Sequence, residues 1–211
     1  MKTVIEGLKW RYATKKFDPT KKLSQEQLDM LLEAMRLAPS SYGLQPWKFI
    51  VVTNPEKREQ LKAAGYGQNQ ITDASHLIVF AVDTRINNED IDKYIHAIAQ
   101  TRGIPEESLK DFEGMMKSFV AGKSPEELTE WAARQAYIAL GVLISAGATE
   151  GIDIAPMEGF DPTKFDEILE LGKLDLATKV IAAVGFRAQD DAFAQMAKVR
   201  YPKEEVVITY D

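Results

Sequence analysis

The spacing of hydrophobic and polar residues predicts alternating helices and strands. After Ser24, the apolar residues Leu28, Leu31 and Met35 recur at helical spacing, and a glutamine three positions after Ser24 completes a capping box. A continuous apolar run at 77–82 predicts a strand buried on both faces, and two further runs also read as strands, at 47–53 and 178–186. Further helices are expected after Asn54-Pro55, over 88–101, over 106–121, and from Asp161-Pro162 to near Gly172. The pattern predicts an α+β fold with a three-layer core.

One expected helix has almost no polar face. Ser124-Pro125 has the pattern of a helix start, and the chain from Trp131 to Ala148 is then apolar or small almost all round. A monomer of this size cannot easily bury a helix that is apolar on all sides. We therefore expect this helix at an interface between two copies of the chain. Gly141 and Gly147 would permit close backbone approach there, although a helix end at Gly147 or Gly151 explains the glycines equally well. The tail at 206–210 reads as a short strand that needs a sheet edge.

Composition narrows the classes of function. The chain has 211 residues, of which 45% are hydrophobic, and a net charge of -6 from 32 acidic and 26 basic residues. Without a global positive field, binding to nucleic acid or to acidic membranes is not expected. The absence of cysteine excludes disulfides, thiolate nucleophiles and cysteine metal sites. No run of 18 apolar residues and no signal core are present, so we expect no membrane span and a cytoplasmic protein.

Familiar catalytic motifs are missing. The segment GYGQNQ at 65–70 lacks the third glycine of a dinucleotide fingerprint, and GKS at 122–124 lacks the earlier glycine of a phosphate loop. His76 and His96 stand alone, so we interpret both as structural or surface residues, and we expect no metal site. If the chain is an enzyme, a cofactor therefore carries the chemistry.

Three segments are candidates for binding. Two are basic: RYATKKFD at 11–18 and KVRYP at 198–202. Arginine forks and lysine charges suit a phosphate, although solvated surface charge explains either cluster in isolation. The third, RLAPSSYGLQPWKFIVV at 36–52, puts two prolines, two serines and a tryptophan directly before a strand. We interpret this loop as one whose backbone approaches another group closely, such as a bound ligand.

Five segments in order closely resemble the nitroreductase family, near its oxygen-insensitive nitroreductase and dihydropteridine reductase branch. They are RYATKKFD, APSSYGLQPWKFIVV, DASHLIVF, APMEGFD and KVRYP. The resemblance covers essentially the whole chain and implies one FMN-binding domain over 1–211, with a mixed central sheet flanked by helices. It also implies a homodimer with two FMN sites built from both chains, which agrees with the expected interface helix.

The resemblance assigns roles to both basic clusters. Arg11, Lys198 and Arg200 would hold the FMN phosphate. Lys15 would lie near the N1 and O2 edge of the flavin, where a cation stabilises developing negative charge. Tyr12 and Ala13 occupy positions that often carry smaller polar residues, so Ala13 can offer only its backbone.

The loops would surround the ring. From the partner subunit would come Pro39, Ser40, Ser41 and Gly43, the last replacing an asparagine of some relatives, while Trp47 packs. Asn69 or Gln70 would read the pyrimidine edge. The strand-end loop would consist of Pro156, Met157, Glu158 and Gly159, with the Glu158 N–H near flavin N5. Ser41 and a candidate lid residue, Phe119, would contact substrate.

The implied activity is reduction of a small-molecule acceptor by NADH or NADPH through FMN. The acceptor would be a nitroaromatic or a quinone, and one pocket used in turn gives ping-pong kinetics. No acidic or basic side chain is required. A flavin or pteridine reductase, or a flavin-binding module without turnover, is the alternative.

Overall fold

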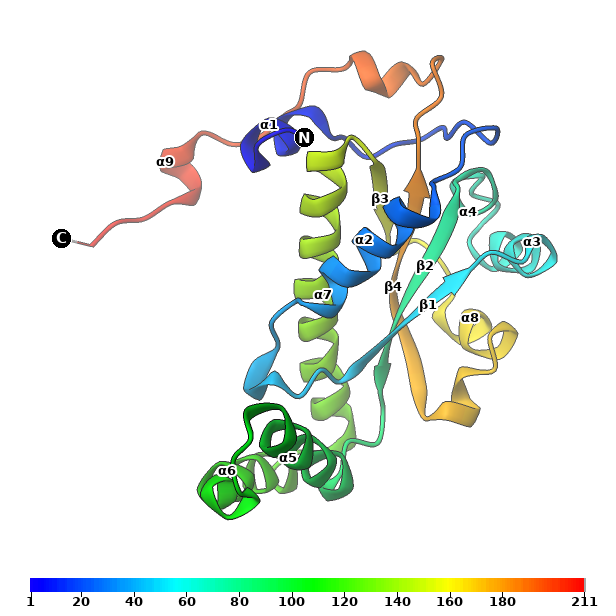
Figure 1. Ribbon diagram of the computed structural model, residues 1–211. Helices are drawn as coiled ribbons and strands as arrows, with labels where there is room; N and C mark the ends of the chain where they lie inside the picture. The colour runs from blue at the N-terminus through cyan, green and yellow to red at the C-terminus, as the bar shows by residue number, and fades with distance from the viewer. Residues whose placement is uncertain (211) are drawn as a thin grey trace.

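A four-stranded antiparallel sheet forms the centre of the molecule (Figure 1). The computed structural model describes residues 1–210, and Asp211, the last residue of the expected domain, lies outside the described residues. The strands are β1 (Trp47–Val52), β2 (His76–Asp83), β3 (Asp153–Met157) and β4 (Leu176–Gly185), in the order β1-β2-β4-β3. The α+β class is confirmed, while all three pairings within this chain are antiparallel rather than mixed.

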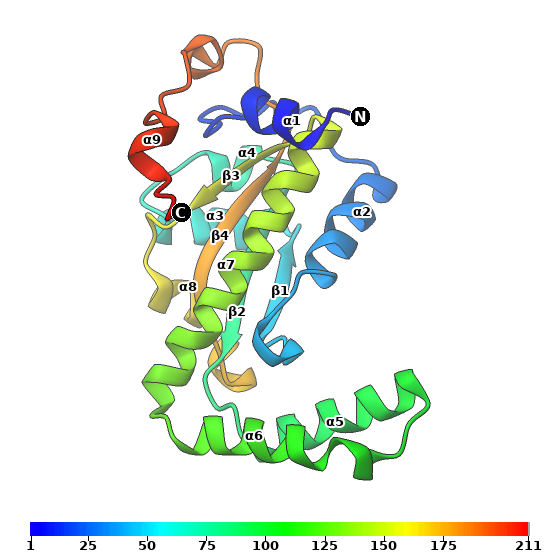
Figure 2. The ribbon, with the colours of Figure 1, turned by 90° about the vertical axis from the view of Figure 1, so that its left-hand side faces the viewer.

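Helices cover both faces of the sheet. One side carries α1 (Val4–Trp10), α2 (Gln25–Arg36) and α7 (Pro125–Glu150), and the other carries α3 (Pro55–Ala64), α4 (Gln70–Asp73) and α8 (Pro162–Ile168). An arm of α5 (Asn88–Arg102) and α6 (Lys110–Ala121) projects from one end of the sheet, and α9 (Lys203–Val206) lies in the tail (Figure 2). The three-layer arrangement is confirmed.

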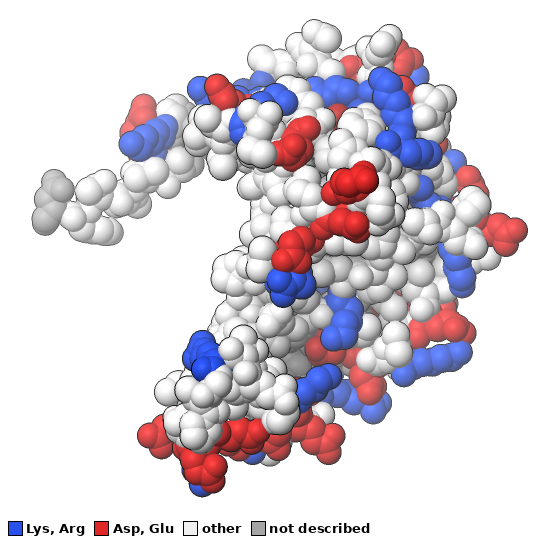
Figure 3. All heavy atoms as spheres, in the orientation of Figure 1, with Lys and Arg blue, Asp and Glu red and all other residues white. Residues whose placement is uncertain are grey.

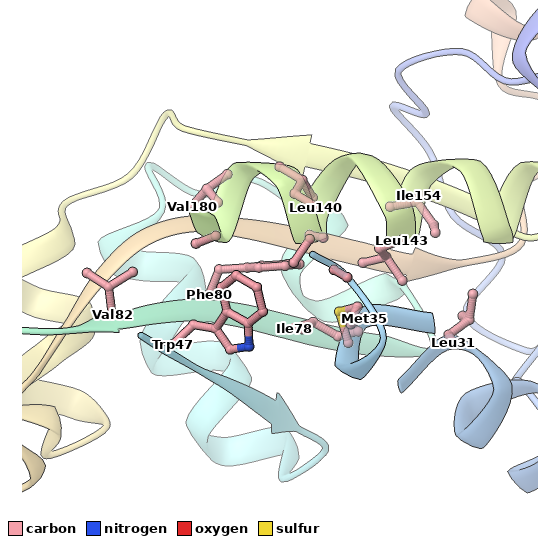
Figure 4. Close-up of a cluster of buried hydrophobic side chains, with 14 of the residues drawn as sticks. Leu31, Met35, Trp47, Ile78, Phe80, Val82, Leu140, Leu143, Ile154 and Val180 are labelled. Atoms are coloured by element: carbon pink, nitrogen blue, oxygen red, sulfur yellow. The ribbon is translucent and has the colours of Figure 1, made fainter. Parts of the chain in front are cut away.

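The alternation of side chains along β2 builds both halves of the core. Ile78, Phe80 and Val82 point toward α2 and α7, where Trp47 joins them (Figure 4). Leu77 and Val79 pack on the other side, under α3 and α8. The indole of Trp47 is 5% exposed, and its ring centroid lies 5.7 Å from that of Phe49. The expectation that Trp47 packs is therefore confirmed.

Many of the expected elements agree with the structure, although the helix expected over 106–121 begins as a 3₁₀ turn over Glu106–Leu109. Ser24 and Ser124 both form capping boxes. The helix expected to end near Gly172 ends earlier, at Ile168, and a separate 3₁₀ turn follows over Leu171–Leu174. The hydrophobic pattern did not predict the strand β3, because this strand is short and contains Pro156. Proline is tolerated there because β3 is an edge strand, where a missing N–H need not break a ladder bond.

The outer face of α7 is apolar and uncovered. Ile138 is 43% exposed, and it lines a hollow of about 450 Å³ together with Val4, Gly141, Val142, Ser145, Ala146 and Thr149. The arm and the tail project toward the same side (Figure 1). Gly147 packs closely within its own chain, since an added Cβ would lie 2.3 Å from a methyl of Ile154, and Gly151 ends the helix with φ of 74°. The close approach expected of Gly141 and Gly147 at an interface stays a prediction. The dimer stays a prediction.

The strand expected at 206–210 is not formed within the described part of this chain. Val206 closes α9, and Val207 is extended, with φ of -124° and ψ of 119°. The reason is physical: a strand needs a neighbour to accept its backbone hydrogen bonds, and this tail leads away from the sheet. Within residues 1–210, no helix has the length and apolar character needed to cross a bilayer.

Candidate functional site

The two basic segments, 187 residues apart in sequence at Arg11 and Lys198, meet in one pocket. The pocket has a volume of about 450 Å³. Of the predicted cofactor-binding residues, it is lined by Arg11, Tyr12, Ala13, Lys15, Lys198 and Arg200. Positive side chains also gather along this end of the molecule, in contrast to the acidic edge of the arm (Figure 3).

Within residues 1–210, Arg11, Lys198 and Arg200 have only backbone carbonyls as acceptors. Arg11 donates from Nη2 to the carbonyl of Tyr12 at 2.7 Å, but its buried Nε has no partner among these residues. Burial, followed by the nearby Arg200, lowers the pKa of Arg11. Burial, followed by Arg11 and Arg200, also lowers the pKa of Lys198. An anion would accept from the unpartnered N–H and relieve the repulsion, so these residues fit a phosphate.

Asp191 holds the N-terminal side of the pocket in shape. Its carboxylate accepts from the Tyr12 hydroxyl at 2.8 Å, from the backbone N–H of Lys15 at 2.9 Å and from that of Lys16 at 3.0 Å. Burial alone would raise the pKa of Asp191, but the N–H groups of Lys16 and Lys15 and the tyrosine hydroxyl together lower it. No pattern in the sequence indicated this role, because Asp191 lies in an ordinary polar loop.

A partly buried ion pair supports the same segment. Arg187 donates to Asp153 through Nη2 at 2.6 Å and Nε at 3.0 Å. The guanidinium lies 4.1 Å from the ring centroid of Trp10 and 4.5 Å from that of Tyr12. The pair therefore joins β3 and β4 to the floor of the pocket. Asp153 is a lone acid in the apolar run GIDIAPM, and this signal could have identified it.

The loop at 65–70 and the loop after β3 lie against each other. Gln68 donates from Nε2 to the carbonyl of Gly159 at 2.6 Å and to that of Gly65 at 2.9 Å. Asn69 is exposed and Gln70 partly exposed at the start of α4. The two predicted ring-binding segments are thus neighbours, although the residue that joins them is Gln68, which sequence reasoning did not select.

The loop before β1 is well defined but distant from the cation pocket. It forms a 3₁₀ turn over Ser41–Gly43, and Ser41 donates its N–H to Gln135 of α7 at 2.9 Å. Gly43 has φ of 76°, and an added Cβ would lie 2.1 Å from the hydroxyl of Tyr94. Glycine suits this left-handed backbone, and a larger residue would have to displace the Tyr94 hydroxyl. Pro39, Ser40, Ser41 and Gly43 do not line the pocket of their own chain.

Phe119 also lies apart from the cation pocket. Its ring centroid is 5.2 Å from that of Trp131 and 5.3 Å from that of Tyr42. The side chain therefore packs where the arm meets α7. Its proposed lid role is untested.

Comparison with known proteins agrees with this architecture. The chain matches the Nitroreductase family over residues 8–186. A Staphylococcus epidermidis protein provisionally named NAD(P)H nitroreductase is 37% identical, with 97% of this chain and 96% of that protein covered.

Solved structures share the fold. A provisionally assigned nitroreductase of Bacillus subtilis has a TM-score of 0.87 at 20% identity, with 98% of each chain covered. Another, from Exiguobacterium sibiricum and in complex with FMN, has a TM-score of 0.84 at 21% identity, covering 100% of this chain and 98% of that one. The length and completeness of the sequence matches leave one conclusion: the chain belongs to the nitroreductase family of oxidoreductases.

Proposed function

We propose that this protein is an FMN-dependent NAD(P)H oxidoreductase that reduces nitroaromatics, quinones or both. The observation that carries the proposal is the pocket of Arg11, Lys198 and Arg200, in which a buried arginine N–H has no acceptor in the part of the chain that the structure describes. The FMN phosphate would supply that acceptor. An FMN-bound structural neighbour and a relative named as an NAD(P)H nitroreductase support the choice of cofactor and reductant.

Each segment of the site has a proposed task. Arg11, Lys198 and Arg200 bind the phosphate. Lys15, which also lines this pocket, stabilises negative charge at the pyrimidine edge of the flavin ring. Asn69 or Gln70 donates to that edge, and the Glu158 N–H, one residue beyond the last ladder pair of β3, is the donor that we assign to N5. Pro156, Met157 and Gly159 shape this loop.

The chemistry that FMN supplies when bound is hydride transfer from NAD(P)H to the acceptor. The chain orients the two reactants and excludes water from the contact. Because reductant and acceptor would use one pocket in turn, ping-pong kinetics are expected. No side chain needs to act as acid or base, since water can supply protons.

The complete site would require two copies of the chain. The uncovered apolar face of α7 and the projecting arm and tail suit a homodimer. In the dimer, the partner would contribute Pro39, Ser40, Ser41 and Gly43 to the ring, with Ser41 and Phe119 near the substrate. This arrangement explains why a well-ordered loop lies far from the pocket of its own chain.

Cofactor analysis and turnover test the proposal together. Purified protein should be yellow and should release FMN, not FAD, when denatured. It should oxidise NADH or NADPH with a nitroaromatic or a quinone, and free flavin and a pteridine should be run beside them as acceptors. A colourless protein that leaves FMN fluorescence unchanged in a titration would contradict the proposal.

A further inference from the structure

The loop after β3 is gripped by two side chains that have no role in the function proposed above. This loop, residues 158–159, runs from the end of β3 at Met157 toward α8. Glu158 and Gly159 are exposed, whereas Met157 before them and Phe160 after them are buried. The Met157–Glu158 peptide, which carries the assigned N–H, therefore leads from a buried residue into the exposed part of the loop.

The first grip comes from α7. Tyr137 donates its hydroxyl to Oε1 of Glu158 at 2.5 Å. Burial, followed by the Glu158 carboxylate, raises the pKa of Tyr137, so this hydroxyl stays protonated and remains a donor at any physiological pH. A charge-assisted hydrogen bond of this kind is roughly twice as strong as a neutral one. Helix α7 thereby fixes the side chain of Glu158, whose backbone N–H is the donor assigned to the flavin.

The second grip comes from the opposite side. The Gln68 amide donates to the carbonyl of Gly159 at 2.6 Å, and the same nitrogen donates to Gly65 at 2.9 Å. Next along the chain, the N–H of Asp161 donates to the carbonyl of Ala64 at 3.0 Å. The loop is thus attached both to α7 and to the turn after α3.

We propose that Tyr137 and Gln68 are positioning residues, which hold residues 158–159 so that the N–H of the Met157–Glu158 peptide is presented in one orientation. The proposal rests on the function proposed above, because it gives that N–H its task. A surface loop without these bonds would sample several peptide orientations, and a donor that must meet one atom loses effectiveness when it is misplaced by about 1 Å.

Three variants test the first grip. Tyr137→Phe removes only the hydroxyl, Glu158→Ala removes its acceptor, and the third variant combines both. Tyr210→Phe is the matched control, since Tyr210 is 91% exposed and its hydroxyl has no partner among the described residues. Gln68→Glu keeps the shape of the second grip but removes both N–H donors.

The first measurement is amide hydrogen exchange at Phe160 and Asp161, whose N–H groups donate to the carbonyls of Glu158 and Ala64, made on the protein as purified. Loss of one such hydrogen bond should make exchange there roughly 3- to 30-fold faster in Tyr137→Phe, with an effect at least as large in Gln68→Glu, which loses two, and none in Tyr210→Phe. The second measurement is the rate constant for reduction of the bound flavin by NADH or NADPH, which should fall by roughly the same factor. The FMN dissociation constant should stay within about 3-fold, because the phosphate pocket is untouched.

The double variant decides between positioning and general loosening. If Tyr137 acts through Glu158, the double variant should be no slower than the slower single variant. Additive losses, or exchange in Tyr137→Phe that equals wild type, would overturn the proposal while leaving the proposed function intact. A wild-type protein that takes up no FMN would instead overturn both.

Discussion

The Nζ of Lys198 donates a hydrogen bond to the carbonyl oxygen of Leu8 at 2.7 Å, across 190 positions of the chain. Leu8 lies in the last turn of α1, where backbone carbonyls lack helical partners and attract cations. This contact brings the tail against the N-terminal segment. It explains how two basic clusters that look unrelated in the sequence come to face the same pocket.

Removing the charge of Asp191 should lower the stability of the protein and its affinity for FMN. Asp191→Asn keeps the size of the side chain but weakens the hydrogen bonds from Tyr12, Lys15 and Lys16. We expect the free energy of unfolding in urea to fall by about 1–2 kcal/mol, since the site is buried. Asp190→Asn is the control, because the adjacent Asp190 is exposed and its ion pair with Lys16 should contribute nothing measurable. Equal effects of the two variants would contradict the account.

The effect of Asp191 should also depend on pH. The folded-state pKa of Asp191 is lowered below its ordinary value of 3.8, so unfolding takes up a proton in acid. Its stabilising contribution is therefore complete at neutral pH and is lost as the pH falls through 3.8 toward the folded-state pKa. The difference in stability between wild type and Asp191→Asn should shrink over that window.

Gly43 and Gly67 separate backbone strain from steric contact. Both have positive φ, 76° and 74°, but an added Cβ meets the Tyr94 hydroxyl at 2.1 Å only at Gly43. Each alanine variant should lose about 1–2 kcal/mol to the left-handed backbone, and Gly43→Ala should lose more because Tyr94 must also move. Thermal unfolding of both variants measures the difference. If Gly43→Ala is no less stable than Gly67→Ala, the loop is not packed on the arm as described.

The proposed dimer should depend on the outer face of α7. Light scattering of the wild type should give twice the chain mass of 23.6 kDa. Ile138→Glu places a charge on the uncovered apolar face and should shift the protein toward monomers. Leu174→Glu is the control, because Leu174 is 64% exposed but lies beside β4 on the α8 side of the sheet. A dimer that is unaffected by Ile138→Glu would place the interface elsewhere.

The sequence predicted the elements that carry a strong local signal. The capped helices at Ser24 and Ser124 and the apolar run of β2 were found because period and capping are local properties. The tail strand at 206–210 was not found in this chain, because strand propensity does not supply a partner strand. The end of the expected helix at Ile168 was also missed. Glu170 adopts a left-handed backbone with φ of 57°, a conformation that glycine usually marks in a sequence, and no glycine stands there.

The site was predictable only in part. The resemblance selected the cations of the pocket, and the structure brings Arg11, Lys198 and Arg200 together. It could not select Asp191, Gln68 or Tyr137, since each acts through a hydrogen bond to a residue distant in sequence. Such contacts depend on tertiary packing, and no spacing along the chain encodes them.

Lys15 is expected to affect the flavin ring rather than its phosphate. Lys15→Ala removes the cation that we assign to the pyrimidine edge, so negative charge there becomes less favourable. The two-electron reduction potential of the bound flavin should fall by about 30 mV, which corresponds to about 1.4 kcal/mol. Affinities for FMN and riboflavin should change alike. Redox titration with a reference dye measures the potential. An unchanged value would show that Lys15 does not act on the flavin ring.

The central claim, that the pocket between the N-terminal segment and the tail holds the FMN phosphate, is tested most directly by Arg200→Ala. Dissociation constants for FMN and for riboflavin, which lacks the phosphate, should be measured by fluorescence titration. Loss of one charge-assisted contact should weaken FMN by roughly 10- to 150-fold, or about 1.5–3 kcal/mol, and leave riboflavin nearly unchanged. Lys203→Ala, an exposed cation in α9 outside the pocket, should alter neither ligand. If Arg200→Ala weakens both ligands equally, or neither, the phosphate is not bound where we place it.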